Sequence, residues 1–136
     1  MKATWNEFEV SAVYKGDKAA GWEFNLPMAD NYNRHIVTVK NTITGKLTRF
    51  DYWTSLAHPQ MQDTKDALLA FLALVDDALT VKEHDFDSFV KEFGYENPSE
   101  AYRAYRGCTL ALKKVTRLLG SRDLYNLVNT LREVDQ

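Results

Sequence analysis

The segment from Asp63 to Thr80 is expected to form a helix that is buried on nearly all sides. Between Leu68 and Val75 its apolar residues cover almost the whole helical circumference, which is the pattern of a helix surrounded by other elements. Asp63 or Thr64 is suited to begin it as the N-cap. The sequence therefore predicts a central helix around which the rest of the chain packs.

Two shorter helices are predicted in the same half of the chain. The first begins with Asp85 as its N-cap and ends at Gly94. Its apolar residues share one face: Phe86, Phe89, Val90 and Phe93. The second is expected at the end of the chain, where Ser121 caps a helix that continues to about Glu133.

A long helix is predicted between these two. The sequence "NPSE" at 97–100 is a strong start, because the Asn caps, the Pro suits the first helical position and the Glu can reach back to the cap. The helix is expected to run to Leu119 and to end at Gly120. Its buried seam follows the spacing 4, 3, 4, 3, 4: Ala101, Tyr105, Cys108, Leu112, Val115 and Leu119. Gly107 beside this seam suggests a close approach by another backbone, and Cys108 is expected to be a core residue rather than a nucleophile.

The first 56 residues show the sequence patterns of β-strands and turns. Phe8–Tyr14 alternates apolar and polar residues, Lys15–Gly21 is expected to turn, and Trp22–Met28 suggests a second strand interrupted by a proline. The clearest hairpin pairs His35–Asn41 with Lys46–Trp53 around "TITG", whose glycine can adopt the positive φ that a tight hairpin needs. Both faces of this hairpin carry apolar groups.

These patterns predict an α+β fold in a single domain covering residues 1–136. A β-rich half (1–56), expected to form an N-terminal antiparallel sheet of three to four strands, is followed by a helical half (63–136), expected to form a C-terminal bundle of about four helices. The longest apolar run, Ala67–Val75, has nine residues and is too short to span a bilayer. The first ten residues lack the apolar core of a signal peptide. We therefore expect a soluble protein with no membrane partner.

Charge is distributed unevenly along the chain. The formal net charge is only −2, which gives no global attraction to nucleic acid or membranes. Yet no acidic residue lies between Arg103 and Arg122, whereas the segment 76–100 holds eight acidic residues against two lysines. One side of the long helix is expected to carry a basic stripe, which Arg122 follows: Arg103, Arg106, Lys113, Lys114 and Arg117.

Two interpretations of this stripe are open. It is either a solvated helix face, partly paired with the acidic segment beside it, or a docking surface for phosphate or for an acidic protein. The aromatic sequence "FDYW" at 50–53 is similarly ambiguous. Tyr52 and Trp53 could stack nucleic-acid bases beside Arg49, or they could simply pack the sheet onto the helices.

No enzyme motif stands out. None of the three histidines, His35, His58 and His84, has metal-ligand spacing from another histidine or from Cys108. There is no glycine-rich phosphate loop, and no carboxylate pair has an obvious partner for acid–base work. The sequence therefore predicts a protein that is not an enzyme, without catalytic residues, metal or cofactor.

Several motifs after Phe50 resemble a family of small, mostly uncharacterised proteins encoded by phages and prophages. They lie at Phe50–His58, Asp66–Ala78, Asp85–Tyr95, Ser99–Cys108 and Leu112–Gly120, about half of the chain. The N-terminal residues 1–49 carry no such resemblance. The resemblance implies a protein that works in the cytoplasm of a bacterial host and has no catalytic activity.

The resemblance leads to two functional hypotheses. Small phage proteins often bind a host machine, so we expect a non-catalytic inhibitor that occludes a host protein complex, such as a CRISPR effector or another defence system. Its binding residues would be the basic stripe, aided by Tyr52 and Trp53. The alternative is a nucleic-acid-binding accessory protein of phage replication or recombination that uses the same stripe.

Overall fold

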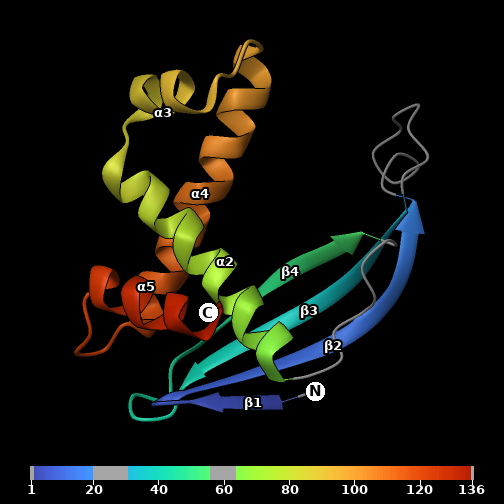
Figure 1. The fold of residues 1–136 in the computed structure, drawn as a ribbon, viewed down its shortest axis with the longest axis vertical. Helices are drawn as coiled ribbons and strands as arrows, with labels where there is room; N and C mark the ends of the chain where they lie inside the picture. The colour runs from blue at the N-terminus through green and yellow to red at the C-terminus, as the bar shows by residue number, and fades with distance from the viewer. Residues whose placement is uncertain (1, 20–30, 56–63, 136) are drawn as a thin grey trace.

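The computed structural model describes residues 2–19, 31–55 and 64–135, and within them the chain forms a four-stranded antiparallel sheet followed by helices (Figure 1). The strands are β1 (Lys2–Trp5), β2 (Phe8–Ala19), β3 (Asn31–Asn41) and β4 (Leu47–Ser55). Their order in the sheet is β1-β2-β3-β4, with every neighbouring pair antiparallel. The predicted α+β fold is confirmed. The strand predicted at 22–28 lies outside the described residues.

The predicted turn after Tyr14 is wrong over its described part. β2 continues through Lys15 to Ala19, and its pairing with β3 shifts register between Tyr14 and Gly16 before it resumes and ends with Ala19 opposite Asn31. A β-bulge absorbs one extra residue, which suits a glycine-containing stretch with weak strand propensity. Pairing with a long β3 therefore overrides the local turn preference.

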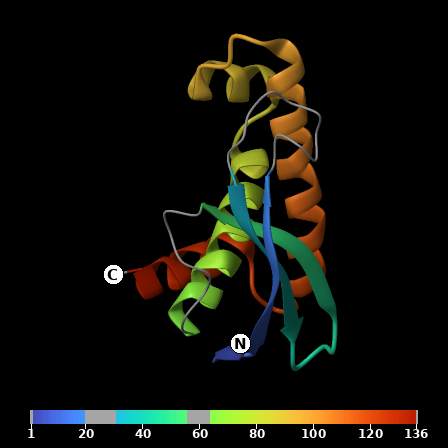
Figure 2. The same ribbon diagram turned by 90° about the vertical axis from the view of Figure 1, so that its right-hand side faces the viewer.

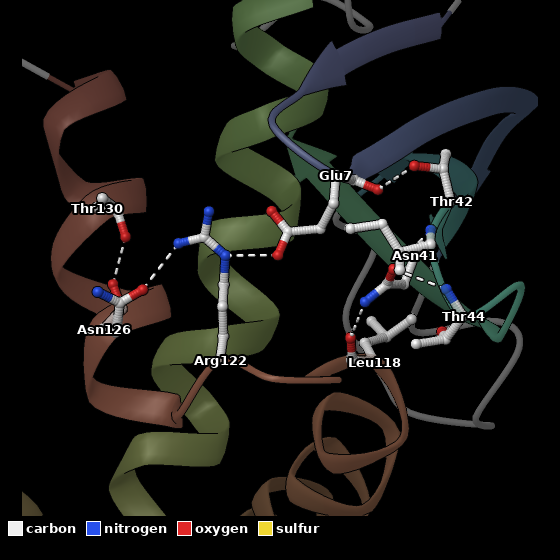
Figure 3. A network of polar contacts seen from close by, with 9 residues as sticks. Glu7, Asn41, Thr42, Thr44, Leu118, Arg122, Asn126 and Thr130 are labelled. Carbon is white, nitrogen blue, oxygen red and sulfur yellow. Dashed lines mark hydrogen bonds and ion pairs between the residues drawn. The ribbon is translucent and has the colours of Figure 1, made fainter.

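The predicted hairpin between β3 and β4 is confirmed. Gly45 has a φ of 77°, a conformation that favours glycine. The buried side chain of Asn41 holds the turn, because its Oδ1 accepts bonds from the backbone N–H groups of Ile43 (3.0 Å) and Thr44 (3.2 Å). Its Nδ2 donates to the carbonyl oxygen of Leu118 at 2.9 Å, which joins the hairpin to the helical half (Figure 3).

The helices are α2 (Thr64–Glu83), α3 (Phe86–Phe93), α4 (Pro98–Leu118) and α5 (Leu124–Arg132), followed by the 3-10 turn η1 (Glu133–Asp135). α2 crosses the sheet with α4 and α5 beside it, so these three helices cover one face, while α3 lies away from the sheet (Figures 1 and 2). The predicted N-cap Asp63 lies outside the described residues. The predicted cap of the last helix is wrong. Asp123, not Ser121, caps α5, because its carboxylate accepts a 2.7 Å bond from the N–H of Asn126.

The core lies between the sheet and the central helix α2, as the sequence predicts. Phe8 and Phe71 are fully buried and pack edge to face with 5.2 Å between ring centroids. The buried set also includes Val10, Val37, Val39, Val75, Val115, Leu118, Leu127, Val128 and Leu131. Burying each such side chain contributes roughly 1.5–3 kcal/mol. The C-terminal part of α4 is thereby fixed against the sheet.

A polar clamp joins the two ends of the chain (Figure 3). Arg122 donates from Nε to Glu7 Oε2 at 2.6 Å and from Nη1 to Asn126 at 2.7 Å. Its guanidinium carbon lies 5.4 Å from the centre of the Trp5 ring. The arginine lowers the pKa of Glu7 below its ordinary value. Arg122 is thus a structural residue and does not extend the basic stripe of α4.

Candidate partner-binding surface

The buried side of α4 differs in part from the predicted seam. Ala101 and Val115 are fully buried as expected, and Ala111 and Leu118 are buried as well. Four predicted seam residues are only half-buried: Tyr105, Cys108, Leu112 and Leu119. The covered sector shifts along the helix because its C-terminal end rests on the β3–β4 hairpin as well as on α2.

The opposite side of α4 forms the basic face. Its residues are Arg103, Arg106, Lys113, Lys114 and Arg117. At 100° per residue these positions fall within about 100° of the circumference, and along the axis they span about 21 Å. Only Lys114 is half-buried, and the other four are exposed. Because Val115 is fully buried on the opposite side, the basic face has a fixed orientation.

The cations of the basic face are not neutralised by the acidic residues nearby. Among the described residues, none of the five forms an ion pair within 4 Å, whereas Asp76 of the acidic segment bonds Arg132 of α5 at 3.0 Å. The pairing envisaged by the solvated-face interpretation is therefore not seen in the described part of the chain. Two exposed apolar side chains accompany these cations: at 100° per residue Leu110 lies inside the basic face and Tyr102 at its border.

Most acidic residues of the segment 76–100 lie at the far end of the molecule, around α3. Asp85 uses its carboxylate to cap α3. Five others are exposed: Glu83, Asp87, Glu92, Glu96 and Glu100. Although the net charge of the chain is near zero, its charges are therefore separated in space, with an acidic end at α3 and a basic face along α4.

Tyr52 and Trp53 do not form a joint surface. Tyr52 is half-buried on the helix-covered side of β4, where burial raises the pKa of its hydroxyl. Trp53 follows on the opposite side, with the guanidinium of Arg34 5.7 Å from its ring centre, and Arg34 also pairs with Asp51 at 3.2 Å. Because side chains alternate along a strand, only Tyr52 lies on the same side as α4.

Cys108 lies half-buried beside a hollow rather than in the closed core. Burial, and to a lesser degree the carboxylate of Asp77, raise the pKa of its thiol to about 11. Since the thiolate is the nucleophilic form, very little of it exists at neutral pH. Within the described ranges, no three His, Cys, Asp or Glu side chains come together to hold a metal ion.

Three surface hollows run beside the basic face and share lining residues. The α3 hollow, of about 390 Å³, lies under Phe93 and Tyr95. The β4 hollow, of about 400 Å³, lies between Tyr52 and Leu110 and shares Asp77 and Gly107 with the α3 hollow. The outer hollow, of about 460 Å³, shares Phe50, Asp51 and Lys114 with the β4 hollow. Because neighbouring hollows share lining residues, they adjoin one another, and we refer to the three together as the groove.

This groove was not predicted from the sequence, although the sequence singled out Gly107, which lies in it. Gly107 was expected to allow another backbone to approach closely. In the structure, a Cβ atom at this position would meet nothing within 4 Å, so the expected contact is absent from the described chain. A glycine inside a helix costs about 1 kcal/mol relative to alanine. No packing reason offsets that cost here.

Comparisons with known proteins add no assignment: no protein-family model, no curated protein and no solved structure matches the chain. The resemblance to phage proteins therefore stays a prediction. Among the described helices, none is long and apolar enough to cross a membrane.

Proposed function

We propose that the protein is a non-catalytic, phage-type inhibitor that docks the basic face of α4 on an anionic surface of a host protein complex and blocks it. The observation that supports this proposal is the set of five cations on one oriented helix face, with no ion-pair partner among the described residues. Charge-assisted hydrogen bonds from such a face favour carboxylate or phosphate groups. A nucleoprotein effector such as a CRISPR complex offers both.

A nucleic-acid-binding accessory protein is the second candidate, because the same face could follow a phosphate backbone. The charge distribution favours the first candidate. Glu100 lies one helical turn before Arg103 on α4, and both Glu96 and Glu100 are exposed at the acidic end. Their charges would repel a long polyanion. A folded protein surface, in contrast, can complement both signs of charge at once.

Charge reversal on α4 tests the proposal. The variant carries Arg106→Glu with Lys113→Glu, and the matched control carries Lys40→Glu with Lys46→Glu, which makes the same charge change at exposed positions on the hairpin. Affinity capture from a bacterial lysate should retain one stoichiometric complex on the wild type and the control, but not on the variant. Equal retention by all three proteins would contradict the role of the basic face.

Binding of labelled DNA and RNA distinguishes the two candidates. A nucleic-acid binder that uses all five cations should lose affinity as salt is added, with a slope of log K against log [salt] of about −4.5 for duplex DNA. It should also lose about tenfold or more in affinity upon the α4 charge reversal. If neither single-stranded nor double-stranded probes bind at low salt, the second candidate fails and the first is unaffected.

A further inference from the structure

The groove beside the basic face follows the free edge of the sheet. β4 is the last strand in the sheet order, so no described strand pairs with its outer side. Three consecutive residues, Phe50, Asp51 and Tyr52, line the β4 hollow. Side chains alternate along a strand, so Phe50 and Tyr52 lie on the helix-covered face and Arg49 and Asp51 on the other. The outer hollow takes in Arg49 and Asp51, and it shares Phe50 and Asp51 with the β4 hollow, so the two hollows adjoin at β4 from opposite faces.

The hydrogen-bond pattern shows which backbone groups line this edge. The N–H of Asn41 donates to the carbonyl oxygen of Lys46 at 2.9 Å, and hydrogen-bonded pairs alternate along an antiparallel ladder. From the printed register of β3 and β4, the backbone groups of Phe50 and Tyr52 point to β3. Those of Arg49 and Asp51 therefore point outward, as templates for another strand.

The β4 hollow lies between β4 and α4, because Phe50, Asp51 and Tyr52 line it from the strand and Gly107, Leu110 and Lys114 line it from the helix. Away from the β3–β4 hairpin the two elements diverge (Figure 1). Gly107 lies where the β4 hollow joins the α3 hollow. With no side chain at this point, an occupant can lie directly against the backbone of α4.

The charges of the groove define the occupant further. Asp77 lies where the two hollows meet, and no described cation forms an ion pair with it. Although part of its surface is exposed, burial and the neighbouring Asp76 raise its pKa, so a basic group beside it would be stabilising. Lys114 offers the opposite charge at the β4 end.

We propose that this groove binds an extended peptide segment of a partner protein, which adds as a strand to the free edge of β4 and crosses α4 at Gly107. The segment places one large apolar side chain in the α3 hollow and another in the β4 hollow. It carries a basic residue opposite Asp77 and an acidic residue near Lys114. Strand addition supplies affinity through the main chain, and the hollows supply specificity. The site is separate from most of the basic face.

Filling the groove at Gly107 is the sharpest test. Displayed random peptides are selected on the wild-type protein, and the enriched peptides are then measured on Gly107→Leu. We expect at least a tenfold loss of affinity, because the new side chain fills the crossing point. Leucine is a far better helix former than glycine, so α4 should not unfold. Thr116→Leu, at an exposed position of α4 away from the groove, adds a bulky side chain and should leave binding unchanged.

Two further measurements test the geometry. Amide hydrogen exchange at Arg49 and Asp51 should slow when a selected peptide binds, because their N–H groups become strand-paired. Asp77→Asn should weaken peptides that carry the basic residue several-fold, with little effect on neutral versions of the same peptides. Peptides that bind Gly107→Leu as tightly as the wild type, or that leave both amides unprotected, would overturn the proposal.

Other outcomes also decide the question. If the wild type is a dimer that Gly107→Leu dissociates, a second copy of the chain fills the groove and the proposal is overturned. A selection that yields no groove-dependent peptide would also overturn it. The test is independent of the proposed function, because reversing Arg106 and Lys113 should leave peptide affinity within about twofold. If that reversal abolishes capture from the lysate but the selection yields no groove-dependent peptide, the proposed function stands and the proposed peptide site is rejected.

Discussion

The two ends of α4 are held very differently. At the C-terminal end, Leu118 is fully buried, its carbonyl accepts a bond from Asn41, and the Glu7–Arg122 clamp lies just beyond. At the N-terminal end, α3 buries only Phe89, while Phe93 is 53% exposed above a hollow. The first end is closed by non-local contacts, whereas the second leaves aromatic surface open. The C-terminal end thus fixes the orientation of the helix, whereas the N-terminal end keeps aromatic surface exposed to solvent.

The largest expected difference comes from removing one apolar side chain at each end. Leu118→Ala should lower the free energy of unfolding by about 2–5 kcal/mol, because it leaves a cavity in a closed core. Phe93→Ala should cost no more than about 1 kcal/mol, because half of its surface already faces water. Chemical denaturation of both variants checks this. Equal losses of stability would show that the α3 end is as tightly packed as the C-terminal end of α4.

The clamp offers a second way to weaken the closed end. Glu7→Gln should lower stability at pH 7 by about 1–2 kcal/mol, because it removes a charge-assisted bond to Arg122. Since the folded-state pKa of Glu7 lies below its ordinary value of 4.5, its contribution is fully present above that pH. The contribution is lost as pH falls through the folded pKa.

Denaturation measured between pH 7 and pH 3 checks this sign. The wild type and Glu7→Gln should converge in stability at the acid end. A difference that stays constant over this range would mean that the carboxylate charge does not stabilise the clamp.

The smallest expected effect is a gain at the open end. Gly107→Ala should raise the free energy of unfolding by about 0.5–1 kcal/mol, because alanine is the better helix former and its Cβ meets nothing within 4 Å. Thermal melting, with Thr116→Ala as a control on the same helix, measures it. A destabilised Gly107→Ala protein would show that another part of the chain packs closely at this position.

Helix ends and strand alternation were predictable because their causes are local. Asp85 and Asn97 cap their helices through bonds to backbone N–H groups two or three residues onward, and Gly94 ends α3 with a φ of 67°. Strand alternation also puts Tyr52 and Trp53 on opposite faces of the hairpin, as in the structure. Grouping both residues in one binding surface disregarded that alternation.

The errors arose where distant segments compete with local preferences. The extension of β2 beyond Tyr14 depends on β3 as a pairing partner, which no local signal specifies. Asp123 rather than Ser121 is the N-cap of α5, a difference of two residues that is common at helix boundaries. The buried sector of α4 changes along the helix because different elements cover its two ends.

The sequence by itself determined the α+β order, the central helix and the basic face of α4, because periodicity and capping act over a few residues. Tertiary structure alone decided that the cations of α4 stay unpaired within the described chain, that Arg122 serves the clamp, and that a groove joins Gly107 to the free edge of β4. Each of these depends on which distant surfaces pack together. That choice is set by the burial of apolar area over the whole fold, to which every segment contributes at once.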